Sequence, residues 1–294
     1  MFQKVFEYAG PHKKGLYAAT AIVLVSVLLG VFPFVLAYQV IAPLVMGEAI
    51  TASFIIQHVI LVLVCLVLQA LFYGWGLNLS HKAAYDTLLR LRTALQKRFE
   101  KLPLGVIQDK GTGTAKKLFV DDVDSLEVLL AHSMPEGIAN LMVPIAVYVA
   151  MFFVDWKLAL LSLASIPLSL VAMMTMYSVG MKKMGPYYMA GQKMNNTIIE
   201  YINGMEVVKV FNKDADSYER FRKDISDYRN YTLAWYRAAW PWMAIYSSLL
   251  PCTIILTLPV GAWFVLCGWS ALPNLILVLC LSLSIGMPLL KSLG

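Results

Sequence analysis

Long apolar segments without charge are the dominant pattern in this chain. The segments free of Asp, Glu, Lys and Arg are residues 15–47, 49–81, 137–154, 158–181 and 238–290. A helix needs about 20 apolar residues to cross the hydrocarbon core of a bilayer, so the first four segments each suit one crossing and the last suits two. Turn-forming residues and a Trp divide the last segment at 267–274. The pattern predicts an all-α membrane protein with six transmembrane helices.

The predicted spans alternate between short connections on one side of the membrane and long ones on the other. The spans are expected at about 15–46, 52–80, 134–154, 158–181, 239–266 and 274–294. The first apolar run is longer than the roughly 7 to 15 residues of a signal-peptide core, so this span is expected to stay in the protein. Ahead of it, residues 1–14 place aromatic and aliphatic side chains among polar ones, which favours an interfacial helix over a frayed tail.

Both long connections, about 81–133 and 182–239, have a helical pattern of apolar positions. Those of the first are Ala84, Leu88, Leu91, Leu95 and Phe99. They indicate an amphipathic extension of the second span. Pro and Gly predict breaks at 102–105 and 110–113, and Asn203-Gly204 predicts another break in the second connection. We therefore expect two long helical hairpins outside the membrane.

The distribution of charge gives the orientation. Only 14% of the residues are charged, compared with about 25% in soluble domains. Nine Lys and Arg lie between Lys82 and Lys117 and ten between Lys182 and Arg237, whereas Lys157 lies on the opposite side. Because basic residues favour the cytoplasmic side, the hairpins and both termini are expected in the cytoplasm. The net charge of +6 then reports this topology, and the expected partner is the lipid bilayer rather than nucleic acid.

The cysteines offer no sign of metal or redox chemistry. They are Cys65, Cys252, Cys267 and Cys280. All four lie in or beside apolar spans, and no two have C-x-x-C spacing. We interpret them as small core residues and predict no metal site.

The turn region of the first hairpin carries a specific motif. Residues 102–127 read LPLGVIQDKGTGTAKKLFVDDVDSLE. This run resembles the first intracellular loop of ABC transporters with the exporter-type (type IV) six-helix fold, where L-P-x-x-F-F-D-x-x-x-x-G-E-L-x-x-R-x-x-x-D-V-D is typical. The matching residues are Leu102, Pro103, Asp109, Gly113, Asp121 or Asp122, Val123 and Asp124. The run departs from the pattern at several positions: Val106 and Ile107 replace the aromatic pair, Ala115 takes the acidic position, and Lys117 or its neighbour stands at the arginine position.

The second hairpin resembles the second intracellular loop of the same family, whose usual form is E-x-x-x-G-I-x-x-V-K-x-F. The residues in register are Glu200, Gly204, Val208, Lys209 and Phe211. Asp155 to Leu158 and Pro288-Leu289 are also similar to the family. The resemblance therefore covers essentially the whole chain.

The resemblance implies coupling helices, which dock on nucleotide-binding domains and transmit their closure to the membrane. The first would consist of Leu104, Gly105, Val106, Ile107, Gln108, Asp109, Lys110 and Gly111, and the second of Asn203, Gly204, Met205, Glu206 and Val207. It also implies a second membrane half, in a homo- or heterodimer, and a nucleotide-binding domain that is fused downstream or separate. Without the resemblance, Asp121, Asp122 and Asp124 would simply solvate a stalk, and Gly204 would simply end a helix.

The chain has no recognisable catalytic site of its own. It contains no G-x-x-x-x-G-K-[ST] phosphate loop. Residues 111–117 are superficially similar, but their spacing fails and no buried strand precedes them. We expect ATP and Mg to bind the associated nucleotide-binding domain, which this chain lacks, and no cofactor to bind the chain itself.

Polar and aromatic residues at membrane depth are candidates for the substrate path. They are Tyr38, Gln69, Trp75, His132, Glu136, Asn140, Tyr148, Met173, Trp240 and Tyr246. Each could equally pack helices, and for His58, His132 and Glu136 a structural hydrogen bond is the favoured interpretation. Met, Trp and Tyr suit a large amphipathic substrate.

The resulting hypothesis is an ATP-driven transporter that exports an amphipathic substrate by alternating access. An importer of a siderophore or metal chelate is the alternative, because the run from His132 to Glu136 looks like the bacterial siderophore-transporter-like subgroup. An ATP-independent carrier would be expected to have buried charges or broken helices near the membrane midplane, and a scaffold gives no reason for the two loop motifs. We expect a multi-pass protein of the bacterial plasma (inner) membrane.

Overall fold

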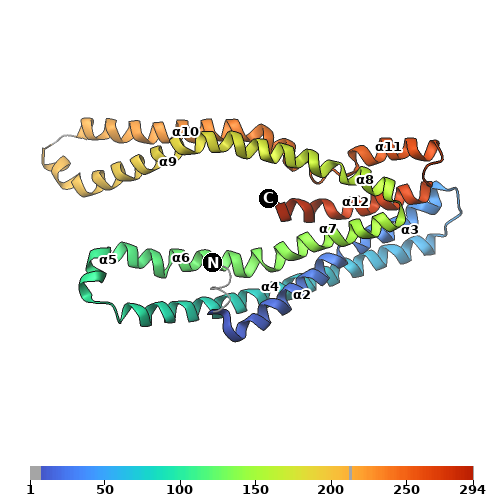
Figure 1. Ribbon diagram of the computed structural model, residues 1–294, viewed down its shortest axis with the longest axis horizontal. Helices are drawn as coiled ribbons and strands as arrows, with labels where there is room; N and C mark the ends of the chain where they lie inside the picture. Colours follow the sequence, from blue (N-terminus) through green and yellow to red (C-terminus); the bar gives the residue numbers. More distant parts are fainter. Residues whose placement is uncertain (1–7, 212–213, 294) are drawn as a thin grey trace. The chain divides into compact units, whose positions relative to one another are not determined.

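The computed structural model describes residues 8–211 and 214–293. Within these residues, side chains are described at all positions except 11, 104, 108–112, 114, 207, 208, 211, 214–218 and 293. The described residues form helices and no strand (Figure 1). The chain divides into two compact units. The first, the main unit, contains residues up to 163 and from 251 onward, and the second, the hairpin unit, contains residues 164–250.

The main unit begins with two consecutive helices in the first predicted span. A single turn of 3-10 helix, η1 (Gly10–His12), leads into α2 (Lys13–Leu29), and α3 (Phe32–Val45) follows. The span predicted at 15–46 is broken between α2 and α3, where Pro33 is the second residue of the new helix. Residues 8–14 are helical, while residues 1–7 of the predicted interfacial helix lie outside the described residues.

α4 (Ala52–Phe99) is the longest helix of the main unit. Thr51 caps it, because its hydroxyl accepts a hydrogen bond from the Phe54 amide at 3.3 Å. Its 48 residues extend about 72 Å at 1.5 Å per residue, which is more than twice the thickness of the bilayer core. Ile56, Leu63 and Leu71 in its first half are exposed, as is expected of side chains that face lipid. The extension of the second span beyond the membrane is therefore part of one continuous helix.

The return path to the third span differs from the expected one. It consists of α5 (Leu104–Phe119), α6 (Asp121–Glu127), the π-helix η2 (Val128–Ser133) and α7 (Pro135–Val154). The break expected at 110–113 is wrong, because α5 continues through these residues. Glycine in a helix interior costs only about 1 kcal/mol relative to alanine, so two glycines do not by themselves end a helix. The helix is instead interrupted at Val120, between α5 and α6.

The π-helix has an identifiable cause in Pro135. Proline has no amide hydrogen, so the carbonyl of Ala131 loses its helical donor. The Ser80 hydroxyl from α4 donates to this carbonyl at 2.8 Å and approaches the Leu130 carbonyl at 3.3 Å. The Met134 amide donates to the Leu129 carbonyl at 3.0 Å, a five-residue spacing. The third span is thus bent open just before Pro135, and the Ser80 hydroxyl of α4 supplies a donor to the freed carbonyl.

The rest of the main unit consists of α8 (Trp156–Leu163), α11 (Ile254–Leu266) and α12 (Leu272–Leu293). Asp155 caps α8 by accepting from the Lys157 amide at 3.0 Å. Gly268, with φ of +72°, allows the turn between α11 and α12. Hydroxyl groups tie these helices together: Ser162 to Ser282 at 2.8 Å, and Thr253 to the Ser282 carbonyl at 2.9 Å.

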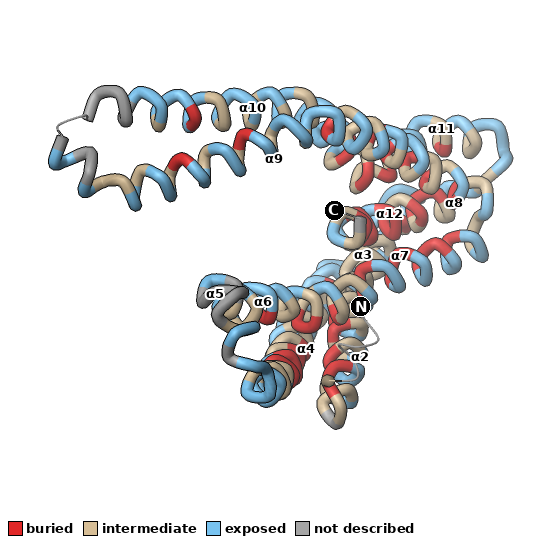
Figure 2. The backbone as a smooth tube through the Cα atoms, turned by 60° about the vertical axis from the view of Figure 1, so that its left-hand side comes forward, coloured by how far each residue is buried: buried red, intermediate tan, exposed pale blue. Residues whose placement is uncertain are grey.

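The hairpin unit consists of α9 (Ser165–Phe211) and α10 (Asp214–Leu249), which lie side by side in both views (Figures 1 and 2). The interruption expected at Asn203-Gly204 is wrong, because α9 continues through both residues. Gly204 is not among the described glycines with positive φ, so nothing in its backbone conformation ends the helix. The Tyr201 ring packs against Phe221 at 5.1 Å and holds this turn of α9 against α10.

Among the described residues, five helical segments are long and apolar enough to cross a membrane. They are Lys13–Val45, Ala52–Phe99, Ala115–Val154, Trp156–Glu206 and Leu272–Ser292. A sixth results when Glu219–Leu249 and Ile254–Leu266 are taken as one broken span. The expected span at 239–266 is interrupted around Pro251, which cannot continue a helix in the usual way. The all-α membrane fold predicted from the charge-free segments is confirmed.

Candidate functional site

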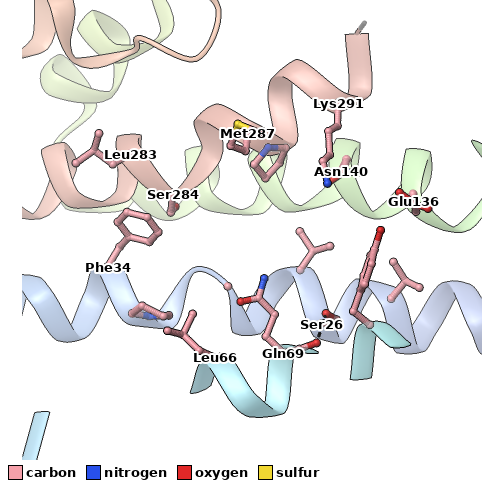
Figure 3. A pocket seen from close by; sticks show the side chains of 16 residues that line it. Ser26, Phe34, Leu66, Gln69, Glu136, Asn140, Leu283, Ser284, Met287 and Lys291 are labelled. Atoms are coloured by element: carbon pink, nitrogen blue, oxygen red, sulfur yellow. Dashed lines mark hydrogen bonds between the residues drawn. The ribbon is translucent and has the colours of Figure 1, made fainter. Parts of the chain in front are cut away.

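A cavity of about 580 Å³ lies in the main unit between α2, α3 and α4 on one side and α7 and α12 on the other (Figure 3). Its volume is within the range of sites that bind one drug-sized molecule. The lining residues are Val23, Ser26, Val27, Gly30, Pro33, Phe34, Leu66, Gln69, Tyr73, Glu136, Asn140, Leu283, Ser284, Met287, Pro288 and Lys291. They form one face of each helix, at steps of three and four residues.

The two ends of the cavity differ in polarity. Glu136, Asn140 and Lys291 gather at one end, and the Lys291 side chain extends from α12 toward α7 there (Figure 3). Phe34 and Leu283 lie at the other end. The cavity is therefore amphipathic along its length, with a charged end and an apolar end.

Close contact between α2 and α4 places Gln69 in the wall. The Ser26 hydroxyl donates to the Gln69 backbone carbonyl at 2.8 Å. A Cβ at Gly30 would lie 2.8 Å from the Gln69 amide nitrogen, so a larger residue there would displace this side chain. Gly76 makes a similar approach, since a Cβ there would lie 2.7 Å from Val23. Small residues therefore set the spacing of the helices that carry the cavity wall.

A chain of hydrogen bonds and ring contacts positions the Glu136 side chain. Its carboxylate lies 2.8 Å from Nδ1 of His132. The His132 ring meets the His81 ring edge-on at 4.8 Å, and Nδ1 of His81 lies 3.5 Å from the Glu127 carboxylate. The Tyr85 hydroxyl donates to Glu127 at 2.7 Å, which raises the pKa of this phenol. The π-helix and its surroundings thus position a carboxylate at the charged end of the cavity.

The structure brings only three of the ten candidate path residues to this cavity, namely Gln69, Glu136 and Asn140. His132 supports Glu136. Tyr38 packs against the cluster of Ala42, Ile276 and Cys280, and the buried Tyr148 hydroxyl reaches the Ser162 carbonyl at 3.5 Å. Trp75 is 61% exposed on α4 and does not line the wall.

The other three candidates belong to the hairpin unit. Met173 is half-buried and Trp240 is exposed. Tyr246 is 5% exposed, and its hydroxyl has no hydrogen-bond partner within the described part of the chain. His58, like His132, forms a structural hydrogen bond: its Nε2 lies 3.1 Å from the Gln39 amide oxygen.

Sequence reasoning missed several wall residues, above all Lys291 and Tyr73. A signal for Tyr73 existed, because it follows Gln69 by four residues and shares its helix face. Ser284, Met287 and Lys291 share a face of α12 in the same way. The sequence does not contain the register of α12 against α7, and only that register makes the Lys291 cation a neighbour of Asn140.

The two hairpin tips contain the residues implied as coupling helices. Gly105 and Val106 are exposed and Ile107 is half-buried, in the first turn of α5 after Pro103. The side chains of Leu104, Gln108, Asp109, Lys110 and Gly111 lie outside the described residues. In α9, Asn203 and Glu206 are exposed and Gly204 and Met205 are half-buried, while the side chain of Val207 is not described.

Specific contacts stiffen the arm that carries the first tip. The Phe99 and Phe119 rings meet edge-on at 5.0 Å and join the end of α4 to the end of α5. Arg92 donates through Nε to the Phe119 carbonyl at 3.1 Å and pairs with the Asp124 carboxylate. The tip is therefore supported by both helical arms of the hairpin, α4 on one side and α5 with α6 on the other.

An ion pair between a buried carboxylate and an exposed lysine stiffens the second arm. Asp224 is 2% exposed and accepts from Nζ of Lys193 and from the Thr197 hydroxyl, both at 2.7 Å. These hydrogen bonds, Lys193 first, lower the pKa of Asp224 against the opposing effect of burial, and the pKa of Lys193 is raised in turn. Farther along, the Tyr187 ring stacks on Tyr228 and Trp235, and the Tyr187–Tyr228 hydroxyl contact at 3.2 Å raises the pKa of Tyr187.

Comparison with known proteins gives a match over nearly the whole chain. The family described as ABC transporter transmembrane region matches residues 16–289. The chain is 34% identical over 145 residues to the mycobactin import ATP-binding/permease protein IrtA of Mycolicibacterium smegmatis, covering 49% of this chain and 17% of that protein. It is 28% identical over 230 residues to the IrtA protein of Mycolicibacterium thermoresistibile, covering 77% and 25%. A fatty acid ABC transporter ATP-binding/permease protein of Mycobacterium bovis is 23% identical over 177 residues, covering 60% and 28%. The chain thus spans less than a third of the length of these relatives.

Proposed function

Because the chain belongs to the ABC transporter transmembrane family, we propose that it forms one membrane half of an ATP-driven transporter that exports an amphipathic substrate by alternating access. The resemblance seen in the two hairpin motifs is confirmed by the family match. The observation that carries the proposal is the amphipathic cavity of about 580 Å³ in the same unit as a stalk that extends far beyond one bilayer thickness.

The energy source is proposed to be a nucleotide-binding domain that binds ATP and Mg. The relatives described as ATP-binding/permease proteins support a fused arrangement. Residues 111–117 of this chain lie inside α5, so they do not form the loop between a strand and a helix that cradles phosphates. This chain's part is to bind and release substrate and to receive the movement of that domain.

Force is proposed to enter through the exposed tips at Gly105 to Ile107 and Asn203 to Glu206. A conformational change can be driven only through an element that makes different contacts in the two states. Exposed tips on arms stiffened by the Arg92–Asp124 and Lys193–Asp224 pairs meet that requirement, because a rigid arm moves the membrane helices when its tip moves. A second copy or a related chain would complete the substrate pathway.

Import is the second candidate direction. It is favoured by the relatives described as mycobactin import proteins, which are 28% to 34% identical to this chain over the matched residues. A metal-chelate ligand would use the same cavity, so direction is decided by which side of the membrane loads it. An ATP-independent carrier is disfavoured by the family match.

The proposal is tested with the protein and its nucleotide-binding partner reconstituted in liposomes. ATP-dependent movement of fluorescent amphipaths and of iron-loaded siderophores is measured in both directions, with a nonhydrolysable ATP analogue as the control. ATP-dependent accumulation of any probe supports the proposal, and its direction separates export from import. Movement that is equally fast with the analogue would indicate a carrier and contradict the proposal.

A further inference from the structure

The charges at one end of the cavity restrict the kind of head group that it can hold. Glu136 and Lys291 both line this end, and no ion pair joins them in the described part of the chain. The Glu136 carboxylate is fixed by His132, while the Lys291 ammonium extends toward Asn140 (Figure 3). A carboxylate and an ammonium group therefore line the same end of the cavity without forming an ion pair with each other.

A ligand head with a single charge would be matched at one of these groups and opposed at the other. An anionic head would pair with Lys291 but be repelled by Glu136. A cationic head would pair with Glu136 but be repelled by Lys291. A zwitterionic head can pair with both groups at once. The side-chain amides of Asn140 and Gln69 also line the cavity and can hydrogen-bond to such a head.

The opposite end of the cavity specifies the rest of the ligand. Pro33, Phe34, Leu66 and Leu283 provide apolar surface, and Met287 is adaptable. Figure 3 shows this apolar surface separated along the cavity from the charged end. An apolar chain of a single amphipath fits this arrangement and the volume of about 580 Å³.

We infer that the cavity binds single-tailed amphipaths with a zwitterionic head, with Glu136 and Lys291 as the pair that selects head-group charge. This inference rests on the proposed function, because it assigns the substrate class of the same cavity. It predicts that loss of the Glu136 charge shifts the preference toward anionic heads and that loss of the Lys291 charge shifts it toward cationic heads. Neither loss should abolish binding.

The test compares three probes with the same acyl or alkyl tail length: a lysophosphatidylcholine, a lysophosphatidylglycerol and an alkyltrimethylammonium. Binding to the purified transporter is measured by native mass spectrometry without nucleotide. The wild type is expected to bind the zwitterionic probe about tenfold more tightly than either of the others. Glu136→Gln should shift the preference toward the anion and Lys291→Gln toward the cation, each by about tenfold.

Matched controls separate head-group selection from general damage. Glu48→Gln and Lys97→Gln remove exposed charges outside the cavity and should leave all three affinities unchanged. Lys291→Arg keeps the cation and should keep the zwitterion preference.

Equal loss of all three probes in both variants, or an unchanged preference, would overturn the inference. Because binding is measured without nucleotide, this outcome leaves ATP-driven transport untouched. Absence of ATP-dependent transport would contradict the proposed function whatever the probe preference is.

Discussion

At the scale of single residues, Ser80 and Pro135 show how a membrane helix tolerates an interruption. A buried carbonyl without a donor is costly where no water is present. Pro135 removes the donor to Ala131, and Ser80 on another helix replaces it at 2.8 Å. The same exchange opens the helix into the π-turn that contains His132, and His132 holds Glu136 at the end of the cavity.

This exchange makes a testable prediction for Ser80→Ala. Loss of the hydroxyl leaves the Ala131 carbonyl unpaired and should destabilise the protein by about 1 to 2 kcal/mol. Adding Pro135→Ala restores a backbone donor, so the double variant should lose less stability than the sum of the two single variants. Unfolding in detergent micelles measures all four proteins, and strictly additive effects would show that the two residues are independent.

Two glycines form a second matched test. A Cβ at Gly286 would lie 2.8 Å from the backbone carbonyl oxygen of Pro251, which cannot rotate away. Gly286→Ala is therefore expected to destabilise the protein by about 1 to 3 kcal/mol. A Cβ at Gly74 would meet nothing within 4 Å, so Gly74→Ala should leave the melting temperature unchanged or slightly higher. Equal melting temperatures for the two variants would contradict the packing described at Gly286.

At the scale of elements, the buried Asp224 makes the stability of the α9–α10 hairpin depend on pH. Its folded pKa is lowered, so its contribution is fully present above the unfolded pKa of about 3.9 and is lost as pH falls below that value. The raised pKa of Lys193 adds stability that is lost only at strongly alkaline pH.

We expect hairpin amides to exchange faster with solvent below about pH 4, after correction for intrinsic rates. Asp224→Asn should be less protected at neutral pH and lose much of this acid sensitivity. Glu219→Gln, an exposed neighbour on α10, serves as the control and should behave as the wild type. Protection of Asp224→Asn equal to that of the wild type would mean that the pair does not hold the hairpin.

The elements also show which features the sequence could and could not predict. Charge-free runs predicted the membrane helices, because no other fold hides so much apolar surface. Gly111, Gly113 and Gly204 do not end their helices, since a glycine in a helix interior costs only about 1 kcal/mol relative to alanine. The break between α2 and α3 comes just before Pro33, which the sequence contains, and the break between α5 and α6 lies at Val120. In the cavity, Glu136 and Asn140 could be predicted as candidates because polar groups at membrane depth are rare. The position of Lys291 in the cavity wall could not be predicted, because it depends on the register of α12 against α7.

At the scale of the whole molecule, the account requires the tips to transmit movement without supporting the fold. Glu206 is exposed at the second tip, and Glu206→Arg should leave membrane insertion and melting temperature unchanged. In the reconstituted transporter it should reduce transport per ATP hydrolysed by roughly fivefold or more, because a reversed charge disturbs docking. Glu219→Gln is again the control. Unchanged coupling in Glu206→Arg would remove this residue from the docking contact.

Access to the cavity under control of ATP is the central claim, and cysteine labelling tests it most directly. Met287→Cys places a thiol at an exposed position of the cavity wall, in a background where the four native cysteines are replaced by serine. A membrane-impermeant maleimide is applied from the side on which the tips lie, first without nucleotide and then with ATP and vanadate. The account predicts at least a fivefold slower reaction in the trapped state, because the cavity closes on that side. An identical labelling rate in the two states would contradict it.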